Sequence, residues 1–240
     1  MKKAIVVGAS SGIGKKLAVL LVEDNYLVGI VGRRKELLNE LKATQPDKFI
    51  VAALDIAEQP DTNKRLEALV QEMGGLDLVV FCAGIGDENP QLNYQIERDT
   101  LEVNVVGFTQ IADWAFHFFQ DQKSGHFVAI TSIAGIRANE LNPAYNASKA
   151  FQINYLEALQ QKQIKYKLPI YITDIRPGFV NTNMAKSENK FWMATVDKVA
   201  SQIMTSINKK ASVVYVTKRW LLVAFVFKLI PRWLRVRIGN

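Results

Sequence analysis

The sequence predicts an α/β fold, a single domain built on one doubly wound, seven-stranded parallel sheet with helices on both faces. Three observations predict it. Short apolar runs alternate with longer segments whose apolar residues recur at helical spacing. The runs are almost continuously apolar, which is typical of parallel strands that are covered on both faces. The 240 residues contain no repeat, low-complexity tract or linker, which indicates one domain.

Each predicted strand except the last is followed by a predicted helix. The strands are expected at AIVVG (4–8), YLVGIVG (26–32), FIVAALD (49–55), LDLVVFCAG (76–84), HFVAITS (126–132), IYITDIRPG (170–178) and SVVYVT (212–217). The helices are expected at residues 11–24, 34–44, 61–73, 99–119, 144–163 and 195–208. Right-handed crossovers between such units predict a Rossmann-type arrangement.

The charge distribution divides the chain into a nearly neutral body and a basic end. The net charge is +7, but the last acidic residue is Asp197, and residues 198–240 contain nine basic residues. The first 197 residues therefore carry 21 basic and 23 acidic side chains, a net charge of −2. This asymmetry indicates either contact with an anionic surface or a solubilising charged edge.

Residues 218–240 are expected to form an extension beyond a domain that spans residues 1–217. Residues 220–227 are eight consecutive apolar residues, fewer than the roughly 20 of a membrane-spanning helix. The extension is therefore expected to pack on its own domain, to form a dimer seam, or to make peripheral contact with a membrane surface.

The single cysteine, Cys82, excludes an intrachain disulfide and favours a reducing compartment. The start of the chain resembles a signal peptide only briefly, because its apolar run ends at Gly8, short of the roughly 7–15 residues of such a leader. A cytoplasmic location is expected, with the inner face of a membrane as the alternative.

The stretch GASSGIG (8–14) lies at the predicted turn from the first strand into the first helix. Gly8, Gly12 and Gly14 would let the backbone approach a pyrophosphate, and the helix N-terminus would offer it unpaired N–H groups. The glycine spacing is a weak signal that the strand–turn–helix context strengthens. The alternative is a glycine-rich turn without a ligand.

The second predicted strand ends in Gly32, Arg33 and Arg34. A site that reads the 2′-hydroxyl of NAD would place Asp or Glu here, whereas arginine pairs bidentately with phosphate. The two arginines therefore favour NADP(H) over NAD(H) as the cofactor. The alternative is a solvated run of surface charge.

Taken in order, these and further motifs resemble the short-chain dehydrogenase/reductase family. The family pattern is a Gly-x3-Gly-x-Gly loop, an Asp after the third strand, Asn-Ala-Gly after the fourth, and then Asn, Ser, Tyr-x3-Lys and Pro-Gly. In this chain it falls on Gly8, Gly12, Gly14, Asp55, residues 82–84, Asn104, Ser132, Tyr145, Lys149, Pro177 and Gly178, and the resemblance covers about residues 3–217. Cys82 departs from the pattern, because a thiol is a poorer hydrogen-bonding group than the amide of the family's Asn.

The resemblance implies a catalytic set and a cofactor site. The implied catalytic residues are Asn104, Ser132, Tyr145 and Lys149. The implied cofactor-binding residues are Gly8, Ser10, Ser11, Gly12, Ile13, Gly14, Arg33, Arg34, Asp55, Ile56, Cys82, Ala83, Gly84, Asn104, Tyr145, Lys149, Pro177, Gly178, Val180 and Thr182. The resemblance also implies a lid over the substrate at residues 183–192, and the apolar residues there indicate a substrate of apolar character.

Tyr145 and Lys149 have the residue types and the spacing of an acid–base pair. A free phenol has a pKa of about 10, too high for efficient proton transfer near neutral pH. Lys149 lies one helical turn after Tyr145, so its ammonium is expected to lower the pKa of that phenol. Ser132 is expected to hydrogen-bond a carbonyl oxygen, although it could also be a cap.

For Asn104 the resemblance implies that it holds a water next to Lys149 and links a proton relay to solvent. The alternative is a buried structural hydrogen-bonder. For Lys149 the resemblance implies a second role, binding of the nicotinamide ribose hydroxyls.

Together these residues predict an NADP(H)-dependent oxidoreductase that transfers hydride between nicotinamide and a carbonyl or alcohol. The alternative is a non-catalytic NADP-binding sensor or scaffold on the same fold, and the presence of both Tyr145 and Lys149 favours the enzyme. A homodimer or homotetramer is expected. Nucleic-acid binding is not expected, because only the basic end would support it. No metal site is expected, and His117 and His126 are interpreted as structural.

Overall fold

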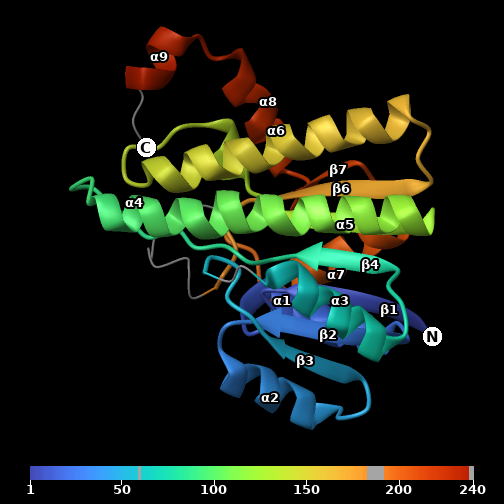
Figure 1. Cartoon of the computed structure of the whole chain (residues 1–240). Helices are drawn as coiled ribbons and strands as arrows, with labels where there is room; N and C mark the ends of the chain where they lie inside the picture. The colour runs from blue at the N-terminus through green and yellow to red at the C-terminus, as the bar shows by residue number, and fades with distance from the viewer. Residues whose placement is uncertain (59–60, 183–191, 238–240) are drawn as a thin grey trace.

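The computed structural model describes residues 1–58, 61–182 and 192–237, and in this part of the chain one sheet of seven parallel strands dominates (Figure 1). The strand order is β3-β2-β1-β4-β5-β6-β7. The strands are β1 (Lys2–Val7), β2 (Tyr26–Gly32), β3 (Phe49–Ala53), β4 (Leu78–Phe81), β5 (Gly125–Ile130), β6 (Ile170–Pro177) and β7 (Val213–Val216). All seven strands predicted from the sequence are confirmed.

The helices connect successive strands as the alternating pattern predicts. They are α1 (Gly12–Glu23), α2 (Lys35–Thr44), α3 (Thr62–Met73), α4 (Tyr94–Leu101), α5 (Phe108–Gln122), α6 (Pro143–Lys165), α7 (Val196–Asn208), α8 (Trp220–Leu229) and α9 (Arg232–Arg237). One expectation is wrong, because residues 99–119 are not a single α-helix. A π-helical turn, η1 (Glu102–Gly107), separates α4 from α5, and such turns are frequent at functional sites.

Two hydrophobic layers cover the sheet, and alternate residues of each strand supply them. On β1, Ala4 and Val6 face the layer that holds α1, α2 and α7, whereas Ile5 and Val7 face the layer of α3, α5 and α6. Because residues 4–7 of β1 are buried on both faces, all four of these positions are apolar. The near-continuous apolar runs in the sequence therefore have a direct structural cause.

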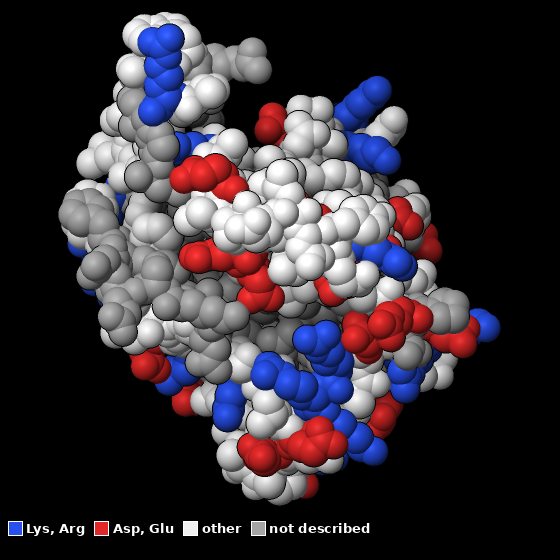
Figure 2. Space-filling model, turned by 90° about the vertical axis from the view of Figure 1, so that its left-hand side faces the viewer, with Lys and Arg blue, Asp and Glu red and all other residues white. Residues whose placement is uncertain are grey.

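The chain reverses its direction of travel across the sheet at β1, which pairs with β2 on one side and β4 on the other. In such folds a ligand binds outside the carboxyl ends of the strands at this switch point. Figure 2 views the molecule from the side on which these strand ends lie in Figure 1, and Lys and Arg side chains gather in its lower half, at the level of β2 and α2. The loops that carry the predicted site residues all leave the sheet at this edge.

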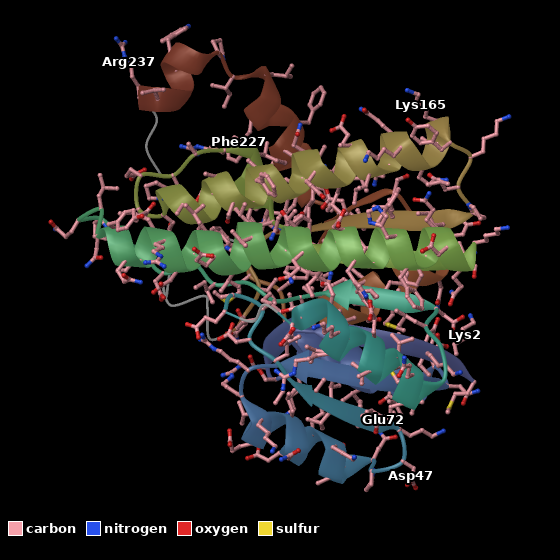
Figure 3. All side chains as sticks on the ribbon, in the orientation of Figure 1. Lys2, Asp47, Glu72, Lys165, Phe227 and Arg237 are labelled. Carbon is pink, nitrogen blue, oxygen red and sulfur yellow. The ribbon has the colours of Figure 1, made fainter. Side chains whose placement is uncertain are left out.

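The C-terminal segment packs on the body through one face of α8. Trp220 and Ala224 are buried there against Ile133, which belongs to the short helix η2 (Ile133–Ile136) after β5. In Figure 3, Arg237 lies at the outer end of the projection that α8 and α9 form beyond α6. Among the helices in the described ranges, none combines the length and the apolar character that crossing a bilayer requires.

Candidate active site

The glycine loop after β1 has the close backbone approach that its sequence predicts. Gly8 and Gly12 have φ angles of +91° and +54°, in the left-handed region that favours glycine. A Cβ on Gly8 would lie 2.6 Å from the backbone nitrogen of Ala83, after β4. The loop therefore packs directly on the β4 exit, and it brings the N-terminus of α1 to the switch point without an acidic residue in the helix's first turn.

Arg34 closes over this loop. Its Nη2 donates hydrogen bonds to Ser10 Oγ at 2.7 Å and Ser11 Oγ at 2.8 Å, and its Nε donates to Ser10 Oγ at 3.2 Å. One guanidinium and two hydroxyls therefore meet at the end of β2, beside the glycine loop. This set of groups can bind a phosphate monoester, because guanidinium and hydroxyl groups both donate to phosphate oxygens.

Arg33 lies apart from this cluster. Its Nη1 is 3.9 Å from Asp55 Oδ2, and its side chain is largely exposed. Asp55 also accepts a hydrogen bond from the backbone nitrogen of Ala57, while Ile56 is buried against Gly107. Of the two arginines that the sequence offered for a 2′-phosphate, the structure joins only Arg34 to the glycine loop.

The loop after β6 reaches across to the glycine loop. Thr182 is the nearest neighbour of Gly12, with its Cγ2 3.5 Å from where a Cβ on that glycine would stand. Val180 is buried and pairs with Ala194 in an isolated bridge. Pro177 ends β6, so the predicted residues of this segment do lie at the switch point. The lid is predicted at residues 183–192, and all of it except Trp192 lies outside the described residues.

Gly178 has no room for a side chain, because the ring of Trp220 occupies the space where a Cβ would stand. The same indole lies edge-on to Phe179 at 5.5 Å between ring centroids. Within the described residues, Trp220 Nε1 is the one buried side-chain nitrogen or oxygen without a hydrogen-bond partner. The C-terminal segment therefore packs directly on the predicted nicotinamide loop of its own domain, one of the placements that the sequence left open.

Ser132 and Tyr145 meet although 12 positions separate them in the chain. Ser132 follows β5 and caps η2 by accepting a hydrogen bond from the nitrogen of Ala134 at 3.0 Å. Its hydroxyl also hydrogen-bonds the phenol of Tyr145, which lies in the first turns of α6. Gly86 lets the Tyr145 ring approach, because any Cβ there would overlap the ring. Ser132 is therefore both a cap and a partner of the phenol.

The pKa of Tyr145 differs from the expected direction. Burial raises it above the ordinary value of 10.0, and the hydrogen bond with Ser132 opposes that rise. Lys149 Nζ lies 5.8 Å from the centroid of the Tyr145 ring and donates its hydrogen bonds elsewhere. The expected net lowering of the Tyr145 pKa is therefore wrong, because burial has the largest effect on this phenol.

Lys149 is a buried ammonium at the centre of the site. Nζ donates to the carbonyl of Ile130 at 3.3 Å and to Gln152 Oε1 at 2.9 Å. Burial lowers the pKa of Lys149 to about 8, and the nearby Cys82 and Asp174 oppose that shift. A lysine with this pKa changes its charge close to physiological pH.

Asn104 lies fully buried in η1. Its side chain accepts from the nitrogen of Ile85 at 3.0 Å and donates to the Ile85 carbonyl at 2.7 Å and to Ser148 Oγ at 3.0 Å. Gly84 passes close by, since a Cβ on it would lie 3.3 Å from Asn104 Oδ1 and 3.5 Å from Lys149 Nζ. Asn104 therefore fixes the loop after β4 against α6, as a structural hydrogen-bonder does.

Gln152 is the site residue that the sequence reasoning missed. It is fully buried on α6, and its Nε2 donates to the backbone carbonyl of Asn104 at 2.8 Å while its Oε1 accepts from Lys149. The resemblance implied a water between Lys149 and Asn104. The only available signal was spacing, because Gln152 lies three positions after Lys149 and so shares its helix face.

Cys82 follows β4 and is half-buried beside Gly14, with its thiol pKa raised to about 12 by burial. It is therefore a neutral, unreactive thiol at physiological pH.

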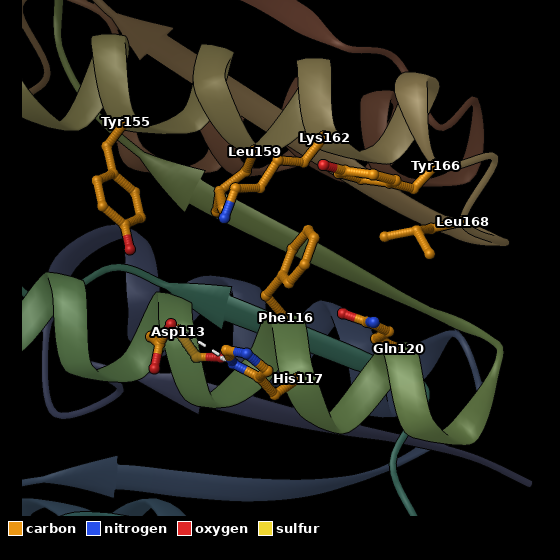
Figure 4. A pocket seen from close by; sticks show the side chains of 9 residues that line it. All are labelled: Asp113, Phe116, His117, Gln120, Tyr155, Leu159, Lys162, Tyr166 and Leu168. Carbon is orange, nitrogen blue, oxygen red and sulfur yellow. Dashed lines mark hydrogen bonds and ion pairs between the residues drawn. The ribbon is translucent and has the colours of Figure 1, made fainter.

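A cavity between α5 and α6 lies apart from these residues (Figure 4). Its lining residues are Asp113, Phe116, His117, Gln120, Tyr155, Leu159, Lys162, Tyr166 and Leu168. None of them belongs to the predicted site, and His117 there hydrogen-bonds its own helix through the carbonyl of Asp113 at 2.9 Å. His126 lies elsewhere, buried beside Thr173 Oγ1 at 2.7 Å, so the structure supports the structural interpretation of both histidines.

Comparisons with known proteins show which family the chain resembles. The short chain dehydrogenase family profile matches residues 2–192. An uncharacterized oxidoreductase of Myxococcus xanthus is 33% identical over 206 residues, which are 82% of this chain and 81% of that protein.

Solved structures share the fold at low identity. A short chain dehydrogenase from Burkholderia cenocepacia, solved in complex with NADP, superposes with a TM-score of 0.84 at 19% identity and covers 100% of both chains. A 3-ketoacyl-(acyl-carrier-protein) reductase from Brucella melitensis, complexed with NADH, has a TM-score of 0.80 at 20% identity and covers 89% of this chain and 95% of its own.

The family profile covers most of the chain, and the glycine loop, Ser132, Tyr145 and Lys149 lie together at the switch point as that family's pattern requires. The chain therefore belongs to the short-chain dehydrogenase/reductase family of NAD(P)-dependent oxidoreductases.

Proposed function

We propose that the protein is an NADP(H)-dependent reductase of carbonyl compounds, with Tyr145 as its general acid. The observation that carries the proposal is the meeting of Ser132, Tyr145 and the buried Lys149 at the carboxyl edge of the sheet. A phenol with a raised pKa is protonated at neutral pH, as a proton donor must be before the reaction. Ser132 is hydrogen-bonded to that phenol and can also donate to a carbonyl oxygen.

The residues of the glycine loop fit a dinucleotide. A Cβ on Gly8 would overlap the backbone of Ala83 and one on Gly14 would overlap the carbonyl of Gly8, so glycine at these two positions lets the loop fold tightly at the start of α1. The unpaired N–H groups at the start of α1 can hold a pyrophosphate. When bound, the cofactor supplies the hydride.

The preference for NADP(H) rests on Arg34. Its guanidinium and the hydroxyls of Ser10 and Ser11 form a cluster of donors at the end of β2, where an adenine ribose lies in folds of this type. An exposed arginine alone would be weak support, because surface charge runs are common. The hydrogen bonds to both serines place this arginine at the glycine loop.

Lys149 supplies the positive charge of the site. At neutral pH its ammonium is the form in excess, because its pKa of about 8 lies above 7. It can stabilise the phenolate that remains after Tyr145 gives up its proton. The ammonium also has donors for ribose hydroxyls, the second role that the family resemblance implies.

The test is a panel of ketones, aldehydes and 3-oxoacyl thioesters assayed with NADPH and with NADH. We expect NADPH oxidation with at least one apolar carbonyl compound, and a weaker response with NADH. A protein that binds NADPH but turns over no member of the panel would support the sensor or scaffold alternative. Equal kcat/KM values with NADH and NADPH would contradict the proposal that Arg34 binds the 2′-phosphate of NADPH.

A further inference from the structure

Helix α8 is apolar on two opposite faces. Its inward face, with Trp220 and Ala224, is buried against η2. Its outward face is exposed although it is equally apolar, and its members are Leu221, Leu222, Phe225, Val226 and Leu229. A helix that is apolar all round is typical of a buried helix, so the outward face of α8 is expected to be covered by something else.

The exposed apolar surface continues onto α9. Trp233 is 63% exposed and Val236 is 75% exposed. We call these two residues and the five exposed residues of α8 the tail surface. Seven exposed large apolar side chains within 16 residues form a concentration that marks an interaction site on a protein surface.

The charge of this segment selects one kind of partner. Residues 218–237 contain six Lys and Arg residues and no acidic residue. The projection at the top of Figure 2, at the level of α8 and α9 in Figure 1, shows basic side chains among residues that are neither basic nor acidic. The Arg237 guanidinium carbon lies 6.0 Å from the centroid of the Trp233 ring, so an aromatic ring and a cation stand side by side at its outer end.

We propose that the tail surface binds the surface of an anionic lipid bilayer, with its apolar side chains in the headgroup–acyl boundary and the basic residues of the segment 218–237 at the lipid phosphates. Amphipathic segments with aromatic, aliphatic and basic residues bind membranes in this way. A second copy of the chain suits the tail surface less well. A two-fold interface would place the same acid-free basic segment against itself.

The attachment of α8 gives this binding a consequence for the reaction, which rests on the proposed function. Trp220 packs on Gly178 and Ile133, close to Ser132, and the Arg137 guanidinium lies 5.0 Å from the centroid of the Phe227 ring. In Figure 3, Phe227 lies where the projection meets the body. A bilayer bound to the tail surface would therefore lie next to the reaction end, and the substrate class it favours is a carbonyl compound dissolved in lipid.

The test is co-sedimentation of the full chain with vesicles of phosphatidylcholine alone and with vesicles of phosphatidylcholine and phosphatidylglycerol. Phe225→Glu is compared with Ile164→Glu, which adds the same charge at a similarly exposed apolar position on α6. We expect binding to the anionic vesicles only. Phe225→Glu should weaken it roughly tenfold or more, because it removes one buried aromatic contact, and Ile164→Glu should change it by less than about twofold.

Several outcomes would overturn the membrane proposal. These are no binding to anionic vesicles, equal loss in both variants, or a wild-type dimer that Phe225→Glu dissociates, which would make the tail surface an interface between copies. Addition of anionic vesicles should raise turnover of a long-chain ketone and leave that of a short-chain ketone unchanged. If the protein binds vesicles but reduces neither ketone, the proposed function fails while the membrane surface stands.

A second inference rests on a different observation, the position of Gln152. Its carboxamide uses both ends, because Oε1 accepts from Lys149 and Nε2 donates to the carbonyl of Asn104. These two bonds orient the amide, since the oxygen can only accept and the nitrogen can only donate. Lys149 Nζ is therefore held by the side chain of Gln152, one turn further along the same helix, and by the carbonyl of Ile130 at the end of β5.

We infer that Gln152 is a positioning residue for Lys149 and takes the place of the water that the family resemblance implies there. A water can accept a proton and release another, whereas a carboxamide cannot do so without becoming an imidic acid. The link from Lys149 to Asn104 therefore holds the ammonium but does not carry protons to solvent.

The pH dependence of the reaction tests this role. The groups near Lys149 are Cys82 after β4, Asp174 on β6 and Tyr145 on α6. Gln152→Leu removes an acceptor that favours the ammonium, so the alkaline limb of kcat/KM should move to lower pH. Gln152→Glu places a carboxylate there and should move the limb to higher pH.

Gln160→Leu is the matched control. Gln160 also lies on α6, and its Nε2 donates to the carbonyls of Ile172 and Ser212, away from Lys149. This variant should lower the melting temperature without moving the alkaline limb. If Gln152→Leu only lowers the melting temperature in the same way, its role is structural and the inference is wrong. The inference also fails if Gln152→Leu and Gln152→Glu move the limb in the same direction.

Discussion

The two ends of the site are built in different ways. The phosphate end, at the exits of β1 and β2, consists of backbone and of exposed side chains, and its hydrogen bonds link Arg34 to Ser10 and Ser11 over about two dozen positions. The reaction end combines the buried side chains of Asn104, Lys149 and Gln152 with the half-buried Ser132 and Tyr145, and burial governs the pKa values of Tyr145 and Lys149. Solvent screens exposed charges, so they interact weakly with one another, whereas the pKa of a buried group depends strongly on the groups next to it.

The largest effect is expected at the reaction end, from Tyr145→Phe. Removing the phenolic proton should lower kcat by about 10²–10⁴-fold, the contribution of a general acid. The Kd for NADPH, measured by fluorescence titration, should change by no more than about threefold, because the glycine loop and Arg34 remain intact. A kcat within a factor of about ten of the wild type would show that Tyr145 is not the acid.

The buried and the exposed ion pairs provide a stability comparison. Arg176 Nε lies 2.7 Å from Asp174 Oδ2, and both side chains are nearly inaccessible. Arg176→Met should lower the free energy of unfolding by about 3–5 kcal/mol, because it leaves a buried carboxylate without its partner. Lys64→Met breaks an exposed pair with Asp61 and should cost less than about 1 kcal/mol. Urea denaturation measures both, and similar losses would contradict the comparison.

At the phosphate end, Arg34→Ala and Arg33→Ala separate the two arginines. Arg34→Ala should raise the Kd for NADPH by about tenfold or more, since hydrogen bonds to charged groups contribute about 1.5–3 kcal/mol each. The Kd for NADH should change little. Arg33→Ala should have a smaller effect on both cofactors, because Arg33 is exposed and lies apart from Ser10 and Ser11. Equal losses in the two variants would mean that both arginines bind the phosphate.

The smallest and most gradual effect is expected from pH. Burial lowers the pKa of Lys149 to about 8, so kcat/KM should fall as the pH rises through that value and the ammonium is lost. The same shift affects stability in the opposite direction. Between about pH 8 and the ordinary value of 10.5, the unfolded chain binds more protons at this lysine, so its contribution to stability rises with pH. If kcat/KM instead stays constant up to pH 10, Lys149 remains charged over that range and the prediction is wrong.

The positions of the strands and the residues of the phosphate end could be predicted from the sequence because each depends on a local pattern. The apolar runs of the strands report burial on both faces, and the Gly8–Gly14 loop and Arg34 lie within local segments whose chemistry can be read directly. The break in the helix around Asn104 had no such signal. Residues 99–119 read as one helix because the π turn adds a residue to the helical turn without changing the apolar character of the segment.

The sequence by itself determined the fold class, the family and the identities of Ser132, Tyr145 and Lys149, because each of these depends on a local pattern or on an ordered set of motifs. The tertiary structure alone decided three things. Gln152 lies between Lys149 and Asn104, burial raises the pKa of Tyr145, and Trp220 packs on Gly178. Each of these results from contacts between segments that are distant in the chain, and a pattern along one segment contains no information about its partner across the fold.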